Sequence, residues 1–403
     1  MLTQLRDKAV PQSLTGHMLV DAYRLPRVFA TGHMMTWGAI SSSTKTARLR
    51  AIDSVYRAFE KRTKEDCLDD LISRQEINRI SDTLEAWYFE LSTSAQDRHV
   101  DNKRRWKYAI EFIVSSVEAS SPAHLLENEV YQRRLSRIRA FGKMKLGNGT
   151  RAFRPRSIPD SVIDEVFSII DPTSEMNPFR TEATAFRNFT IVLMAYELGL
   201  RRGEMAMLPV DAIKEQFDAQ SGQRRRWITI DSNHYERDER STRPSLKTKT
   251  SRRVLPISRA LLQTVNAYRS DFRGKPEHSF LLNSSQEKPL ALPSLNLVFA
   301  VLSNCLCARS RSIIHETCGK ATLSPHDFRH TSAVLRMKRL ISEGKSMQEA
   351  IEDLRVFYGW SKNSDMPQHY ARAYFEGELT ELSSERMERA IESARNSYEG
   401  NRI

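Results

Sequence analysis

Apolar residues recur at helical spacing through the first third of the chain. In the stretch TARLRAIDSVYRAFEKR, apolar positions fall three and four residues apart, which places them on one face of a helix. These positions are Leu49, Ile52, Val55, Tyr56 and Phe59. A later stretch, RRWKYAIEFIVSSVE, repeats the pattern with Trp106, Ile110, Phe112, Ile113 and Val117. The pattern predicts an all-helical module over residues 43–130 that holds no catalytic group, so we expect it to serve in binding.

The pattern changes after Ser157. An apolar helix, FRNFTIVLMAYELGL, leads into a second short helix, and RRWITI, SRRVLPI and HSFLLN resemble strands. Helical spacing returns from about Ser324. The expected fold class is therefore mainly α with a small antiparallel sheet: an all-helical domain followed by an α+β domain. A length of 403 residues agrees with two or three domains at ~150 residues each.

A basic segment separates the two patterns, over residues 131–158. Nine basic residues occur there without an acidic one, and Gly142, Gly147, Gly149 and Pro155 interrupt any continuous helix. The basic residues are Arg133, Arg134, Arg137, Arg139, Lys143, Lys145, Arg151, Arg154 and Arg156. A solvated linker is the ordinary interpretation. We favour a flexible linker that follows a phosphate backbone, because each neutralised phosphate releases counterions.

Composition supports a polyanionic partner and a soluble protein. The chain has 62 Lys and Arg against 50 Asp and Glu, a net charge of +12 and a pI of about 9.6. No segment approaches the roughly 20 apolar residues of a membrane span. The start, MLTQLRDKAVPQ, lacks the apolar core of a signal peptide. We therefore expect a cytoplasmic protein without a membrane partner.

Four cysteines are too few for a disulfide scaffold in a chain of this length, so we expect reduced thiols. A zinc site could be drawn from Cys305, Cys307, His315 and Cys318. However, the Cys-x-Cys spacing is tighter than usual for zinc and no second pair follows. We predict no metal site.

Two places in the second domain carry cationic groups that hydrophobic patterning does not explain. Arg201 follows the apolar run LMAYELGL, so it either emerges at a helix end or points into a site. In SPHDFRHTSA, His326 and Arg329 stand three residues apart and share one face of the helix that opens there. Both could contact one phosphate. Asp327 and His330 are expected to face elsewhere on this helix.

The order of these motifs resembles the catalytic signature of the tyrosine recombinase (phage integrase) family. The motifs are LGLRRGE, a Lys-rich hairpin before a Val-Leu-Pro-Ile strand, HDFRH, and FYGW followed ten residues later by a tyrosine. The resemblance covers Pro159 to Phe375, a little over half of the chain. It implies an N-terminal extension (1–42), a core-binding domain (43–130), the basic linker (131–158), a catalytic domain (159–380) and a tail helix (381–403).

The resemblance implies a role for each matching residue. The catalytic set is Arg201, Lys247, His326, Arg329, Trp360 and Tyr370, with Glu204 in support of Arg201. Tyr370 is the nucleophile, although the interval from Trp360 is one residue longer than usual, which leaves Tyr374 as an alternative. Lys247 fits the hairpin SLKTKTSRRVLPI best, and Lys249 is its competitor.

This set suits attack on a phosphodiester, which crowds negative charge on the non-bridging oxygens. Two arginines offer planar forks of donors to those oxygens, the histidine and tryptophan add single donors, and the lysine can protonate the departing 5′ oxygen. The tyrosine remains joined through a 3′-phosphotyrosyl bond. Because that bond conserves the phosphodiester energy, a 5′-hydroxyl can reverse the reaction without ATP or another cofactor.

The resulting prediction is a site-specific DNA recombinase or integrase of a mobile element. Its expected partners are double-stranded DNA, held between the two domains, and other copies of the chain, as a dimer to tetramer on DNA. Residues 383–398 form a candidate amphipathic helix that either docks on a neighbouring copy or packs on its own domain. Two alternatives share the fold: a relaxing topoisomerase that works as a monomer, and a non-catalytic DNA-binding protein.

Overall fold

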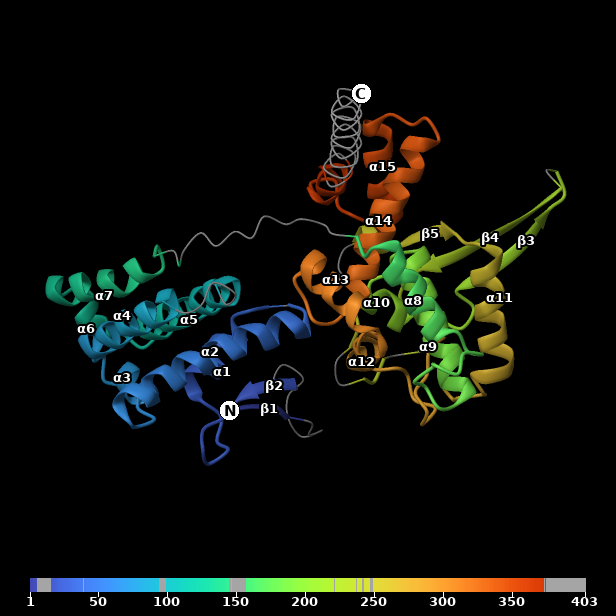
Figure 1. The fold of residues 1–403 in the computed structure, drawn as a ribbon. Helices are drawn as coiled ribbons and strands as arrows, with labels where there is room; N and C mark the ends of the chain where they lie inside the picture. Colours follow the sequence, from blue (N-terminus) through green and yellow to red (C-terminus); the bar gives the residue numbers. More distant parts are fainter. Residues whose placement is uncertain are drawn as a thin grey trace, which may run out of the picture. The chain divides into compact units, whose positions relative to one another are not determined.

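The computed structural model contains two compact units, Met1–Ala152 and Phe153–Ile403, and each is described separately (Figure 1). It describes residues 1–5, 16–38, 40–93, 99–144, 146, 157–220, 222–236, 238–240, 243–246, 249–372 and 374. Within these residues no helix is both long enough and apolar enough to cross a membrane. The predicted tail helix, 381–403, lies outside the described residues.

The N-terminal unit is a helical domain that also holds a short hairpin. The hairpin pairs β1 with β2 in antiparallel fashion, with Leu2 opposite Leu19. The elements are β1 (Leu2–Leu5), β2 (Gly16–Leu19), α1 (Val28–Met35), α2 (Ser42–Thr63), α3 (Leu68–Ser73), α4 (Ile77–Thr93), α5 (His99–Ala119), α6 (Ala123–Leu126) and α7 (Glu129–Phe141).

One apolar core joins these elements. The predicted apolar faces of α2 and α5 are buried in it, which confirms the helical spacing. Leu19, Ala30 and Met34 belong to the same core. Residues 1–42 are therefore not a separate extension where they are described, because β2 and α1 supply part of the apolar interior.

The first part of the predicted linker is also a folded element. Residues 129–141 form α7, whose Tyr131, Leu135, Ile138 and Phe141 are buried in the core of the N-terminal unit. Asn128 starts the helix by accepting a hydrogen bond from the Tyr131 backbone N–H. The sequence pattern was misinterpreted here because the glycines that interrupt a helix begin only at Gly142, one residue after α7 ends.

The C-terminal unit is an α+β domain with a small antiparallel sheet, as predicted, but the sheet contains the unpredicted strand β3 in place of HSFLLN. Its elements are α8 (Asp160–Ile170), α9 (Glu182–Glu197), α10 (Arg202–Met207), β3 (Ile213–Asp218), β4 (Gln223–Ile230), the 3-10 turn η2 (Lys249–Ser251), β5 (Arg253–Pro256), α11 (Arg259–Ala267), the π-helical turn η3 (Tyr268–Phe272), α12 (Leu292–Cys305), α13 (Ala308–Cys318), α14 (Pro325–Ser342) and α15 (Met347–Tyr358).

The sheet follows the order β3-β4-β5, with Ile228 of β4 opposite both Ile213 and Leu255. All three side chains are buried in the core. The β3–β4 hairpin extends beyond the helices of its unit (Figure 1). The third predicted strand, HSFLLN, makes only isolated bridges, from Phe280 to Pro209 and from Asn283 to Pro289.

Candidate functional site

The turn into α10 places Arg201 at the start of that helix. Gly199 has a left-handed φ of 56°, and a Cβ atom on it would lie 2.6 Å from Cε1 of Tyr358, so only glycine fits there. Arg201 is the N-cap residue of α10. Glu204, three residues later, accepts hydrogen bonds from the Arg201 backbone N–H (3.0 Å) and guanidinium (2.6 Å).

The carboxylate of Glu204 is the centre of a buried ionic cluster. Its side chain is 2% exposed, and it accepts two hydrogen bonds from Arg253, at 3.2 and 3.0 Å. The guanidinium of Arg329 lies 4.0 Å away. Burial favours the neutral acid, but Arg253, Arg329 and Arg201 outweigh it and hold the pKa of Glu204 below its ordinary value. The carboxylate is therefore ionised and fixes three cations around itself.

Sequence reasoning missed Arg253. Side chains two residues apart in a strand share a face, and Leu255 of β5 is buried in the core. The alternation in SRRVLPI therefore carried a signal that Arg253 also points inward, where it needs a carboxylate partner.

Arg329 on α14 is almost completely buried. Its guanidinium donates to the backbone oxygens of Gly199 (2.6 Å) and Tyr358 (2.7 Å). It also lies over the rings of Tyr358 and Trp360, 4.9 and 5.5 Å from their centroids. Burial and the neighbouring Arg201 lower the pKa of Arg329 to about 10, so it stays protonated at neutral pH. The structure thus brings the two predicted arginines to the same carboxylate.

The first turn of α14 carries the predicted histidine. His326 is exposed, and its ring centroid lies 4.2 Å from that of His330. Partial loss of water and the charge of Arg329 lower the pKa of His326, which keeps its imidazole neutral at pH 7. Asp327 is buried and accepts from Lys320 Nζ and Ser324 Oγ, both at 2.6 Å.

Tyr370 lies beside this cluster in a stack of aromatic rings. Its ring is parallel to that of Trp360 to within 15°, at a centroid distance of 5.3 Å, and Trp360 in turn stacks on Tyr358. The Tyr370 side chain is 0% exposed, and its hydroxyl lies 2.5 Å from Nδ1 of His330. Tyr374, the alternative nucleophile, is partly buried against the same core.

His330 was expected to face away from the site, and that expectation is wrong. Four residues separate His326 from His330, so the two rings lie one turn apart on the same side of α14. This spacing was the signal in the sequence that could have found His330.

Lys247 lies outside the described residues, and of Lys249 only the backbone is described, at the start of η2. The chain on both sides approaches the site. A Cβ atom on Gly203 of α10 would lie 3.2 Å from the oxygen of Ser245, and one on Gly359 would lie 2.7 Å from that of Thr250. Ser245 is therefore packed against the start of α10, and Thr250 against the glycine before Trp360.

The basic residues of α7 have acidic neighbours in space, although none occurs within the segment. Arg133 pairs with Glu129, and Arg139 with Glu118 at 2.6 Å. Arg137 lies 3.0 Å from Glu85 and 3.5 Å from Asp82. Arg134 and Lys143 are exposed, and Lys145, Arg151, Arg154 and Arg156 lie outside the described residues. The predicted positive run is thus partly neutralised by α4 and α5.

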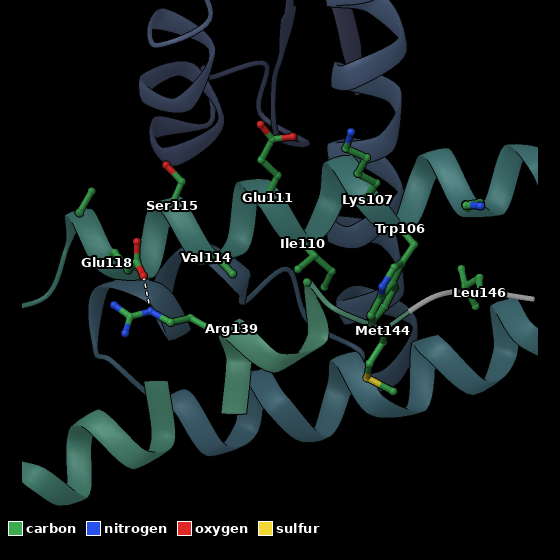
Figure 2. Close-up of a pocket in the computed structure, with 13 residues that line it drawn as sticks. Trp106, Lys107, Ile110, Glu111, Val114, Ser115, Glu118, Arg139, Met144 and Leu146 are labelled. Carbon is green, nitrogen blue, oxygen red and sulfur yellow. Dashed lines mark hydrogen bonds and ion pairs between the residues drawn. The ribbon is translucent and has the colours of Figure 1, made fainter. Parts of the chain in front are cut away.

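The thiols and one cavity are further candidate sites within the part of the chain that the structure describes. All four cysteines are free thiols, and the described part of the chain holds no cluster of three His, Cys, Asp or Glu residues able to bind a metal. The N-terminal unit has a cavity of about 970 Å³ along α5, lined by Trp106, Ile110, Val114 and Met144 (Figure 2). An ion pair between Arg139 and Glu118 crosses its edge.

Comparisons with known proteins gave structural matches only. No protein-family model and no curated protein matches the sequence. The structure of the XerA recombinase matches with a TM-score of 0.34 and 13% identity, over 82% of this chain and 98% of XerA. The XerH site-specific recombinase bound to palindromic difH after cleavage matches with a TM-score of 0.49 and 13% identity, over 85% of this chain and 82% of XerH. The XerH pre-cleavage complex with difH matches with a TM-score of 0.47 and 10% identity, over 87% of this chain and 88% of XerH.

Proposed function

We propose that this chain is a tyrosine-type site-specific recombinase or integrase, which cleaves and rejoins DNA strands through a 3′-phosphotyrosyl intermediate. One observation supports this above the others. Arg201 and Arg329 are held by one buried carboxylate, Glu204, beside the ring stack that contains Trp360 and Tyr370. DNA binding alone requires neither this cluster nor a tyrosine next to it.

The two arginines suit a phosphoryl group whose charge increases during the reaction. Glu204 fixes the position of Arg201, whose side chain is 23% exposed and keeps donors for an anion, because an arginine carries five N–H groups. Arg329 is buried, so it must be uncovered together with Tyr370 before its remaining donors meet the phosphate. Such prearranged cations lower the barrier without rearrangement as charge develops on the phosphate oxygens. Neutral His326 can donate one further hydrogen bond.

The remaining steps are assigned to the tyrosine and the lysine. The Tyr370 hydroxyl gives up its proton to water as its oxygen attacks phosphorus, forms the O–P bond and displaces the 5′ oxygen of the next nucleotide. Lys247, with Lys249 as the alternative, donates the proton that the 5′ oxygen takes up. The reverse reaction uses a 5′-hydroxyl from another strand, so exchange needs at least two copies of the chain on double-stranded DNA.

Covalent capture tests the proposal in the native host. Cells that express the full chain are lysed in denaturant, and DNA that stays attached to the protein is recovered and sequenced. A recombinase yields a common sequence at the attachment points, whereas a relaxing topoisomerase yields scattered sites and relaxes plasmids that lack them. Recovery of no attached DNA contradicts both catalytic functions and leaves the non-catalytic DNA-binding protein.

The nucleophile is then tested on a nicked suicide substrate built from the recovered site. Tyr370→Phe should keep DNA affinity and abolish the covalent adduct, while Tyr374→Phe should retain it. The opposite pattern moves the nucleophile by one helical turn and leaves the proposed function in place. An unchanged adduct in both variants contradicts the assignment of either tyrosine.

A further inference from the structure

The hydroxyl of Tyr370 points at a histidine. Tyr370 Oη lies 2.5 Å from His330 Nδ1, in an environment where the tyrosine is 0% and the histidine 7% exposed. His330 directly follows Arg329 on α14, but the Arg329 guanidinium donates to the oxygens of Gly199 and Tyr358. In this state the hydroxyl is held by the histidine.

This arrangement does not allow attack. A phosphodiester is a bulky, hydrated anion, and it cannot reach an oxygen atom without exposed surface. Burial also raises the pKa of Tyr370 above its ordinary value, which keeps the hydroxyl protonated. The structure therefore shows the tyrosine in an unreactive position.

His330 is a poor proton acceptor in this position. Burial and the neighbouring His326 lower the pKa of His330 to about 3, so proton transfer from the tyrosine is strongly unfavourable. A neutral imidazole with its proton on Nε2 still accepts a hydrogen bond at Nδ1. The geometry and the charges therefore favour a hydrogen-bond acceptor over a general base.

We propose that His330 is a positioning residue that stores Tyr370 in the ring stack, so that the tyrosine must break its bond with His330 before it can attack. This inference rests on the proposed function, because it assigns a resting state to that nucleophile. Trp360 covers the ring and His330 satisfies the hydroxyl, which together give the buried side chain a favourable position.

Removing the acceptor should release the tyrosine. A buried hydroxyl without a partner is unfavourable. Loss of the His330 acceptor therefore shifts the population of Tyr370 conformations toward those in which the side chain is exposed to solvent. The expected change in the exposed population is on the order of five-fold, which corresponds to the loss of one neutral hydrogen bond.

Chemical modification of the full-length protein without DNA tests the stored state directly. Tetranitromethane nitrates accessible tyrosines, and mass spectrometry of the peptides measures the rate at Tyr370. We expect slow nitration of Tyr370 in the unsubstituted protein and roughly five-fold faster nitration in His330→Phe, which has a ring but no acceptor. His330→Asn, which keeps an acceptor near the Nδ1 position, should restore slow nitration.

A matched control removes a different hydrogen bond from the same helix. Ser332 Oγ lies 2.8 Å from the hydroxyl of Tyr358, so Ser332→Ala also removes a hydrogen bond from a buried tyrosine hydroxyl. Nitration of Tyr370 should stay slow in this variant. Circular dichroism confirms the fold of each variant, and His330→Leu replaces His330→Phe if the larger ring prevents folding.

Adduct formation provides the second measurement. With the suicide substrate, the initial rate for His330→Phe should be several-fold above that of the unsubstituted protein. Unchanged nitration of Tyr370 in folded His330→Phe overturns the proposal. Loss of the adduct together with faster nitration also overturns it, because His330 would then be needed during attack. Failure of every protein to form an adduct contradicts the proposed function alone, since nitration does not depend on DNA.

Discussion

Glu204 is the residue on which the geometry of the candidate site depends. A fully buried carboxylate is unfavourable unless cations compensate for it, and here Arg201, Arg253 and Arg329 surround it. The three guanidinium groups depend on Glu204 in turn, because each is buried or half-buried and needs an anion to compensate for its charge. One acidic side chain therefore positions both predicted catalytic arginines.

Substitution of Glu204 by Gln should destabilise the C-terminal unit and misplace the arginines. We expect the free energy of unfolding to fall by about 3–5 kcal/mol, because the variant leaves buried cations uncompensated. Urea titration followed by circular dichroism measures this loss. Glu343→Gln, which removes the partner of Arg339 in an exposed pair, should cost about 1 kcal/mol or less. Similar losses in the two variants would contradict the role of Glu204.

Among the elements, the ends of helices bring distant segments together. Gly359 ends α15 in a left-handed conformation, with φ of 60°, directly before Trp360. The space that a Cβ atom would need is occupied by the Thr250 oxygen and Ser251 Cα, at 2.7 and 3.1 Å. This close approach holds η2 beside the aromatic stack.

Gly359→Ala should therefore reduce activity as well as stability. The left-handed backbone alone costs about 1–2 kcal/mol for alanine, and the clash with Thr250 must also push η2 away. Gly319 provides a matched control, since it ends α13 with φ of 63° and no atom lies within 4 Å of its Cβ position. Gly319→Ala should lower the melting temperature but leave the rate of adduct formation unchanged. Equal activity of the two variants would contradict the importance of the contact.

The basic residues on and just after α7 fall into two groups. All are exposed, but Arg137 and Arg139 pair with acidic residues of α4 and α5, whereas Arg134 and Lys143 have no ion pair within the described residues. Only cations that can reach a phosphate contribute to the salt dependence of DNA binding.

Replacement of Arg134 and Lys143 by Ala should weaken binding to all DNA sequences alike. The slope of log affinity against log salt should become shallower by up to about 1.8, since each lost phosphate contact removes about 0.9. Fluorescence anisotropy at several salt concentrations measures it. Arg139→Ala serves as a comparison that should mainly reduce stability. An unchanged slope in the double variant would show that this face of α7 does not follow a phosphate backbone.

At the scale of the whole molecule, the protein itself supplies positive charge that could otherwise come from a metal ion. The net charge is +12, and Arg201 and Arg329 supply fixed cations where the phosphate is expected. We predict that covalent adduct formation persists in excess EDTA, because these guanidinium groups would supply the positive charge that a metal ion provides in metal-dependent phosphoryl-transfer enzymes. Loss of the adduct in EDTA and its return with Mg²⁺ would contradict this mechanism.

Much of the architecture could be predicted from short-range patterns. Helical spacing identified α2, α5 and the start of α14, and strand alternation identified β4 and β5, because these patterns reflect the period of a single element. The same local geometry placed His326 and Arg329 on one face of a helix. The resemblance of ordered motifs then selected Arg201, Glu204, Trp360 and Tyr370 as members of one site.

Contacts between distant segments could not be predicted in this way. The bond from His330 to Tyr370 joins residues 40 positions apart, the pair of Arg253 and Glu204 spans 49, and Arg137 reaches back 52 residues to Glu85. Each depends on how helices and strands pack, and packing responds to volume and burial across the whole unit. Sequence patterns therefore determined which residues are candidates for the chemistry, while tertiary packing alone decided which charges are compensated and that the tyrosine hydroxyl is buried against a histidine.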